Sequence, residues 1–157
     1  MASIDPDGEF PHTILVATDG SDVARGALEH SLDIARQCNG EIHLLTVVDT
    51  TATPVAFGVE DVHDLERAKK RLVEDLAVTY DDHAVDVTSA VRRGRPARAI
   101  LAYADETEAD LIALGKKGRD GVAQVLLGST TERVVHEASV PVLVVPEDTD
   151  SESATDT

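Results

Sequence analysis

The sequence is poor in aromatic residues, which make up 3% of its 157 residues and include no tryptophan. The hydrophobic core must therefore come from Val, Leu, Ile and Ala, as is usual where helices pack on a sheet. Single-strand nucleic-acid binders stack bases on aromatic rings, so a platform of that kind is not expected here. At this length, with 42% hydrophobic residues, the chain fits one domain with one core.

Basic residues are also scarce, and the formal net charge is -16. Such a field repels polyanions, so neither nucleic acid nor an anionic membrane is an expected partner. Among the charged residues Asp outnumbers Glu and Arg outnumbers Lys. This balance is typical of halophilic proteins, which work where salt reduces the Debye length to about 3 Å. The alternative is an ordinary acidic cytosolic protein.

Cysteine and long apolar runs are nearly absent. Cys38 is the only cysteine, so it forms no internal disulfide, and its place in a helical pattern predicts a small buried hydrophobic residue. Acids occupy the start of the chain where a signal peptide has bases, and no apolar run is long enough to cross a bilayer. We therefore expect a cytoplasmic protein. The histidines show no metal-ligand spacing, so no protein-ligated metal is expected.

The chain divides into one domain with a short segment at each end. Residues 1–11 are predicted to be flexible, and residues 147–157 are acidic, rich in Ser and Thr and predicted to be disordered. The folded domain is expected over residues 12–146.

Apolar strand patterns alternate with amphipathic helix patterns, which predicts an α/β fold with a mostly parallel sheet. The expected strands are Thr13–Thr18, Glu41–Val48, Ala84–Val91, Asp110–Leu114 and Val140–Val145. Ser21 is the expected N-cap of the first helix, and Asn39-Gly40 its stop. The second helix, from about Glu60 to Tyr80, has an apolar stripe at Leu65, Ala68, Leu72 and Leu76. Further helices are expected from Pro96 and from about Gly128 to Glu137.

Two strands are expected at the edges of the sheet. The third alternates apolar and polar residues, as an edge strand does. The last, Val140–Val145, is uniformly apolar, and an uncovered apolar edge invites pairing with another chain. We therefore predict a homodimer through this strand. The alternative is that a tail or a helix covers the edge.

The strongest local motif is a glycine pattern between the fourth strand and the last helix. It places Gly115 and Gly118 after the strand, and nine residues separate Gly118 from Gly128-Ser129. Glycines let backbone amides approach an anion, and a helix amino end adds free N–H groups with positive dipole. Ser129, Thr130 and Thr131 add hydroxyl groups, and the nearest basic residues are Lys116, Lys117 and Arg119. The pattern predicts a phosphate site; alternatively the glycines only shape a loop and cap a helix.

This motif and several other segments resemble the universal stress protein family. The resemblance covers about residues 13–146 and rests on the segments Ile14–Ser21, Thr46–Asp49, Gly94–Pro96 and Asp110–Val145. It implies a three-layer α/β/α fold with a five-stranded parallel sheet of order 3-2-1-4-5. The ligand would then lie at the carboxyl ends of strands 1 and 4, the switch point of such a sheet.

Resemblance to the ATP-binding members also implies a set of site residues. Asp19 would bind the ribose hydroxyls, and Val47 would contact adenine. Gly115, Gly118, Gly128, Ser129 and Thr131 would bind the phosphates, and Thr18, Leu114 and Thr130 belong to the same candidate set. Without a ligand, Asp19 would only cap the turn before the first helix, and Val47 would be core.

The predicted function is therefore that of an ATP-binding regulator in the stress response, with Mg²⁺ arriving on the nucleotide. No Walker, dinucleotide-binding or nucleotidyl-transfer motif is present, so no catalytic residue is assigned. The alternatives are a slow ATPase and a nucleotide-free dimeric interaction module of the same fold. The cluster Arg92, Arg93, Arg95 and Arg98 is interpreted as a solvated face that pairs with acids.

Overall fold

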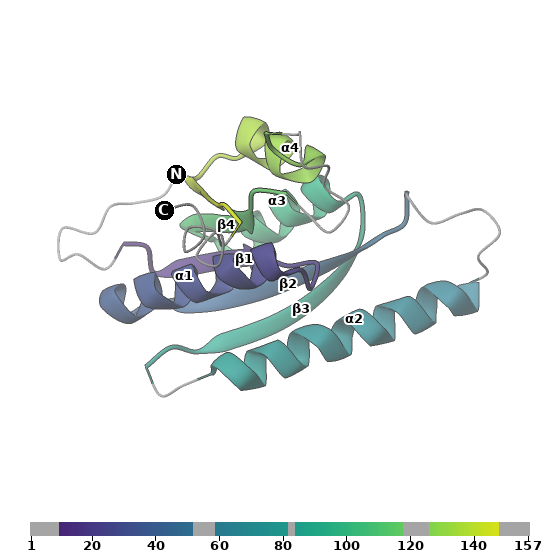
Figure 1. Cartoon of the computed structure of the whole chain (residues 1–157), viewed down its shortest axis with the longest axis horizontal. Coiled ribbons are helices and arrows are strands. Elements are labelled where there is room, and N and C mark those ends of the chain that lie inside the picture. Colours follow the sequence, from purple (N-terminus) through teal and green to yellow (C-terminus); the bar gives the residue numbers. More distant parts are fainter. Residues whose placement is uncertain (1–9, 52–58, 82–83, 118–125, 148–157) are drawn as a thin grey trace, which may run out of the picture.

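The protein is seen here in a computed structural model that describes residues 10–51, 59–81, 84–117 and 126–147 (Figure 1). Five parallel strands form one sheet in the order β3-β2-β1-β4-β5, which confirms the expected topology. The strands are β1 (Thr13–Ala17), β2 (Glu41–Asp49), β3 (Val87–Gly94), β4 (Leu111–Gly115) and β5 (Val142–Val145). The helices are α1 (Asp22–Cys38), α2 (Val59–Tyr80), α3 (Pro96–Thr107) and α4 (Ser129–Glu137).

Helices cover both faces of the sheet, which gives the expected three layers (Figure 1). One cluster of buried residues joins α1 and α2 to the sheet, and a second joins α3 and α4 to its other face. The central strand β1 contributes to both clusters, since Ile14 and Val16 face one and Leu15 the other, all fully buried. Its apolar run from Ile14 to Ala17 is what a strand covered on both faces requires.

Helix α1 begins and ends at the predicted residues. The Ser21 hydroxyl oxygen accepts the Ala24 N–H at 3.2 Å, and Asn39 ends the helix in the left-handed conformation with φ of 54°. At Gly40 a Cβ atom would lie 2.8 Å from the His12 carbonyl oxygen, so only glycine fits there. This close contact brings the end of α1 against the start of β1. Cys38 is half-buried rather than buried, and its thiol lies 3.2 Å from the Phe10 carbonyl oxygen.

The edge strands differ from prediction in their bounds. Strand β3 is at an edge, as predicted, but it runs from Val87 to Gly94 and so includes Arg92 and Arg93. These residues are exposed on the edge strand, where a polar side chain does not interrupt pairing. Arg93 pairs with Glu66 and Arg92 with Glu106 at 3.6 Å, as expected of a solvated face. The last strand begins at Val142, after Pro141, which has no N–H group for the ladder.

The predicted apolar stripe of α2 is wrong in its first half. Leu65 is 39% exposed and Ala68 is also exposed, whereas Val73, Leu76 and Ala77 are buried. Among the described side chains of the first half, the partly buried ones are the apolar Val62 and two charged residues: Glu66, which contacts Arg93, and Lys69, which lines a pocket. Charged residues thus occupy part of the inward side of α2, where the sequence pattern predicted apolar ones. Among the described residues, no helix is long and apolar enough to cross a membrane.

Candidate functional site

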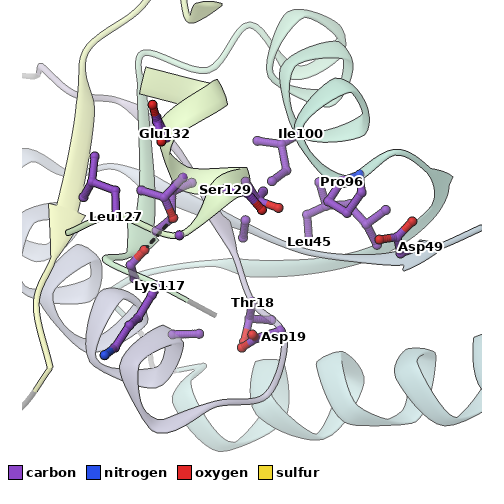
Figure 2. Close-up of a pocket in the computed structure, with 18 of the residues that line it drawn as sticks. Thr18, Asp19, Leu45, Asp49, Pro96, Ile100, Lys117, Leu127, Ser129 and Glu132 are labelled. Carbon is purple, nitrogen blue, oxygen red and sulfur yellow. Dashed lines mark hydrogen bonds between the residues drawn. The ribbon is translucent and has the colours of Figure 1, made fainter. Parts of the chain in front are cut away.

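A pocket of about 660 Å³ lies at the carboxyl ends of the strands, where β1 and β4 diverge (Figure 2). Loops and helix ends that follow β1, β2, β3 and β4 meet around it. It is lined by Ala17, Thr18, Asp19, Ala24, Leu45, Val47, Asp49, Lys69, Pro96, Ile100, Leu114, Gly115, Lys117, Leu127, Gly128, Ser129, Thr130, Thr131 and Glu132. The place is the one predicted, the switch point of a doubly wound sheet.

The turn after β1 is held by its own hydrogen bonds. The Thr18 N–H donates to the Leu45 carbonyl at 2.8 Å, and the Gly20 N–H donates to the Thr18 hydroxyl at 3.1 Å. The Asp19 carboxylate accepts the Ser21 N–H at 2.9 Å. Gly20 has φ of 85°, a left-handed conformation that favours glycine. Asp19 therefore does stabilise the turn, and this contact also fixes its carboxylate at the wall of the pocket.

The opposite wall is formed by the end of β4, by Lys117 and by the residues at the start of α4. The Thr131 hydroxyl, which is buried, donates to the Gly115 carbonyl at 2.8 Å. The Gly128 N–H donates to the Lys116 carbonyl at 2.9 Å. These two bonds fix the start of α4 against the end of β4. Because the Thr131 hydroxyl donates its proton to the Gly115 carbonyl, the backbone N–H of Thr131 is the group left to donate to a ligand.

The amino end of α4 offers backbone N–H groups to the pocket. Gly128 is the N-cap, in an extended conformation with φ of -65°, and no side chain caps the helix. The first intrahelical bond runs from the Glu132 N–H to the Gly128 carbonyl. The N–H groups of Ser129, Thr130 and Thr131 precede it, and such first-turn donors have no partner one turn earlier. With the positive end of the helix dipole, they form an anion site.

Apolar side chains form the floor of the pocket beside this anion site. Leu45 and Leu114 are buried, Val47 is half-buried, and Ile100 and Pro96 contribute from the first turns of α3. Figure 2 shows Ile100, Pro96 and Leu45 together on one side, with Thr18 and Asp19 below them. The pocket thus combines an apolar surface, a fixed carboxylate and a helix amino end, an arrangement suited to an amphipathic anion.

Gly115 has a second reason to be glycine. A Cβ atom there would lie 2.5 Å from the Val23 Cγ1 atom and 3.2 Å from the Val23 carbonyl carbon. Only a glycine at position 115 therefore lets β4 pack against the first turn of α1. The need for glycine at this position is explained by packing alone, whatever ligand the pocket binds.

The structure brings the predicted site residues together, except one that lies outside the described residues. Thr18, Asp19, Val47, Leu114, Gly115, Gly128, Ser129, Thr130 and Thr131 all line the pocket. Gly118 falls outside the described residues, as does Arg119. Of the predicted basic residues, Lys117 lines the pocket, whereas Lys116 contributes its backbone carbonyl to the loop.

Sequence reasoning missed several lining residues. Asp49 ends β2, and Lys69 comes from α2, far from any motif. Pro96 and Ile100 were assigned only to the third helix and its core face. Their spacing of four residues on the first turns of α3 was a usable signal, because the amino end of that helix also points to the carboxyl edge of the sheet. Lys69 gave no such signal.

A sequence model of the universal stress protein family matches residues 11–146. The chain belongs to this family. A universal stress protein of Methanocaldococcus jannaschii is 32% identical over 136 residues, which are 84% of this chain and 80% of that protein.

Solved structures of the family share the fold. The universal stress protein UspA from Lactobacillus plantarum superposes with a TM-score of 0.75 at 29% identity, over 85% of this chain and 97% of that one. A universal stress protein solved in complex with cAMP gives a TM-score of 0.59 at 26% identity, over 87% of this chain and 98% of that one.

Proposed function

We propose that the protein is an ATP-binding universal stress protein that acts as a nucleotide-dependent regulator in the cytoplasm. The observation that supports this most strongly is the convergence of the α4 amino end and the Asp19 carboxylate on one pocket with an apolar floor. A nucleotide needs these three features for its phosphates, its ribose and its base. The pocket volume of about 660 Å³ lies within the usual range for small-molecule sites.

Each part of the nucleotide has a proposed partner. Adenine would lie on the apolar floor beside Val47 and Leu114, and the ribose hydroxyls would donate to Asp19 near Thr18. The phosphates would accept from the first N–H groups of α4 and from the Ser129 and Thr130 hydroxyls. Gly115 and Gly118 would keep the loop close to the phosphates.

Mg²⁺ would arrive with the nucleotide rather than bind to a protein cage. Among the described residues, no group of three or more His, Cys, Asp or Glu side chains is arranged to hold a metal ion. Mg²⁺ on phosphates takes most of its ligands from phosphate oxygens and water. Its charge would also offset the pocket carboxylates Asp19, Asp49 and Glu132.

A related structure supports binding of an adenine nucleotide in this fold. The relative solved with cAMP shares 26% identity and nearly the full length of the domain. An adenine base, a ribose and at least one phosphate are common to cAMP and ATP. Among these ligands we propose ATP, because the α4 amino end provides several N–H donors for more than one phosphate group.

The alternative functions depend on the same surfaces. A slow ATPase would use the proposed pocket and an unassisted water molecule. A nucleotide-free interaction module would act through β5, where Val142, Leu143 and Val144 are only partly buried at the edge of the sheet. This exposed apolar edge also supports our proposal of a homodimer through β5.

The deciding experiment is calorimetric titration with Mg-ATP in molar potassium chloride, a salt chosen because we also propose a halophilic source. AMP, cAMP and GTP are titrated in parallel, and light scattering measures the mass of the protein. Saturable binding of ATP, tighter than that of AMP or GTP, is expected. A folded, nucleotide-stripped dimer that binds none of these would instead establish the interaction module.

A further inference from the structure

Lys117 lines the pocket, but its ammonium group contacts Glu147 instead of extending into the pocket. Its side chain is only 13% exposed, and its ammonium nitrogen lies 2.9 Å from the Glu147 carboxylate. In Figure 2 the nitrogen end of Lys117 points away from both Asp19 and Ser129. The aliphatic stem thus faces the pocket, while Glu147 holds the ammonium group outside it.

The position of this ion pair follows from the register of the sheet. Gly115 and Val145 are partners at the ends of β4 and β5. Lys117 and Glu147 each lie two residues further along, so the pair continues the ladder past the end of the sheet. The Lys116 N–H, which donates to the Val145 carbonyl at 2.7 Å, keeps the two chain segments together. The contact is therefore built into the fold.

Glu147 and a bound phosphate group would compete for the same cation. An ammonium group attracts a polyphosphate more strongly than it attracts a single carboxylate, because the polyphosphate carries more negative charge. Glu147 is 51% exposed, so breaking its contact returns the carboxylate to water at small cost. Rotation of the long Lys117 side chain about its stem would move the charge from the carboxylate towards the pocket.

We propose that Lys117 is a phosphate-binding residue for the nucleotide and that Glu147 acts as a built-in competitor. This inference rests on the function proposed above. Nucleotide binding transfers the ammonium group from Glu147 to the phosphates and releases the Glu147 carboxylate. Since the ion pair reduces the population of the competent state, Glu147 weakens the apparent affinity for polyphosphates. It has no effect on a ligand without phosphate.

The test is calorimetric titration of four proteins and one control variant with Mg-ATP and with adenosine, at the lowest potassium chloride concentration at which circular dichroism shows the wild type folded. The four proteins are the wild type, Glu147→Gln, Lys117→Met and the double variant. Glu106→Gln is the matched control, because it removes the same charge from another exposed ion pair. Glu106 is ten residues, or about 15 Å along α3, from Pro96, which lines the pocket. Circular dichroism verifies that each variant is folded.

We expect Glu147→Gln to bind ATP about two- to five-fold more tightly than the wild type, from the usual strength of such ion pairs. Adenosine affinity should stay unchanged, and Glu106→Gln should have less effect. In the Lys117→Met background the Glu147→Gln substitution should have no effect. Molar salt should reduce the gain, because it screens the ion pair.

Two results would overturn the inference by itself: equal ATP affinity of Glu147→Gln and the wild type, or an equal gain with Glu106→Gln. Absence of ATP binding in the wild type, Glu106→Gln and Glu147→Gln would overturn the proposed function together with this inference. If Lys117→Met fails to fold, the comparison of the two Gln variants with ATP and adenosine still decides the question.

Discussion

The two ends of the sheet have pockets of nearly equal volume, about 660 Å³ at the carboxyl ends and about 650 Å³ at the amino ends. Their chemistry differs. The carboxyl-end pocket receives the amino ends of α3 and α4, and its charged lining residues are the lysines Lys69 and Lys117 and the acids Asp19, Asp49 and Glu132. The amino-end pocket receives the carboxyl ends of the same helices, and the acids that line it are Glu41, Asp105, Glu108, Asp110 and Glu137.

The difference indicates that strand and helix direction, rather than volume, decides which pocket is suited to an anion. In a parallel α/β fold each helix amino end lies at the carboxyl edge of the sheet, so the positive dipole ends gather there. The negative ends gather at the opposite edge, where no Lys or Arg is among the described lining residues. We therefore expect the carboxyl-end pocket to bind an anion more favourably than the amino-end pocket. Substitutions at the two ends should separate binding from stability.

The largest expected effect is on binding at the carboxyl end. Gly128→Val places two methyl groups at the α4 amino end, where phosphates would approach the backbone, and should weaken ATP binding by about 100-fold or more. The φ of -65° at this N-cap is open to any residue, but Val is a poorer N-cap than Gly, so the cost to stability should be about 1 kcal/mol. Calorimetry and thermal unfolding measure the two effects.

Ser139→Val is the control for that substitution, because it enlarges a small residue that lines the amino-end pocket. ATP affinity should remain that of the wild type. If both valine variants weaken binding equally, the comparison between the two ends fails.

The next largest effect concerns stability at the carboxyl end. Gly115→Ala would force a Cβ atom to within 2.5 Å of the Val23 Cγ1 atom and should destabilise the fold by about 2 kcal/mol. Val23→Ala removes that methyl group, so the double variant should recover part of the loss. Urea unfolding of the four proteins measures the coupling. Equal losses in the presence and absence of Val23 would show that the packing contact is not the cause.

The fold was predictable because its signals are local and repeated. Strand β1 is apolar from Ile14 to Ala17, and Ser21 and Asn39 are sufficient caps for α1. The sheet order was implied by the resemblance to the universal stress protein family. The β1 turn and the α4 amino end were found for the same reason, since each lies within a short motif. Their conformations follow from residues close in sequence, such as Gly20 and Gly128.

What could not be predicted depends on contacts between distant residues. Lys69 and Glu66 occupy the inward side of α2 because of the pocket and Arg93, and no periodicity in α2 records those partners. The ion pair of Lys117 with Glu147 depends on the register of β4 with β5. The packing role of Gly115 depends in turn on Val23, which belongs to another element.

A smaller effect is expected at the amino end, where an acid has a structural role. The Asp110 carboxylate accepts the N–H groups of His12 and Thr13 at 3.0 and 3.1 Å, which fixes the start of β1. Asp110→Ala should destabilise the protein by about 1–2 kcal/mol and leave ATP affinity unchanged. Urea unfolding and calorimetry test both statements. A large loss of affinity in the folded variant would mean that the two ends are coupled.

The smallest effect is a pH dependence at Tyr103, which lies on α3 between the two pockets. Burial raises the pKa of this tyrosine and Glu106 raises it further, while the Arg92 guanidinium, 4.8 Å from the ring centre, lowers it in part. The folded protein therefore keeps the phenol proton where the unfolded chain, with a pKa of about 10, loses it.

The stabilising contribution of Tyr103 is complete below pH 10 or so and is lost as the pH rises through the higher folded-state pKa. Tyr103→Phe should reduce the fall in the free energy of unfolding above about pH 10, measured by urea unfolding across that range. Tyr80 also has a raised pKa, chiefly through burial and then through Glu29, so Tyr80→Phe serves as the comparison. If Tyr103→Phe leaves the alkaline slope unchanged, the phenol keeps an ordinary pKa in the folded state. Water would then reach the Tyr103 side chain more often than its exposed fraction of 6% indicates.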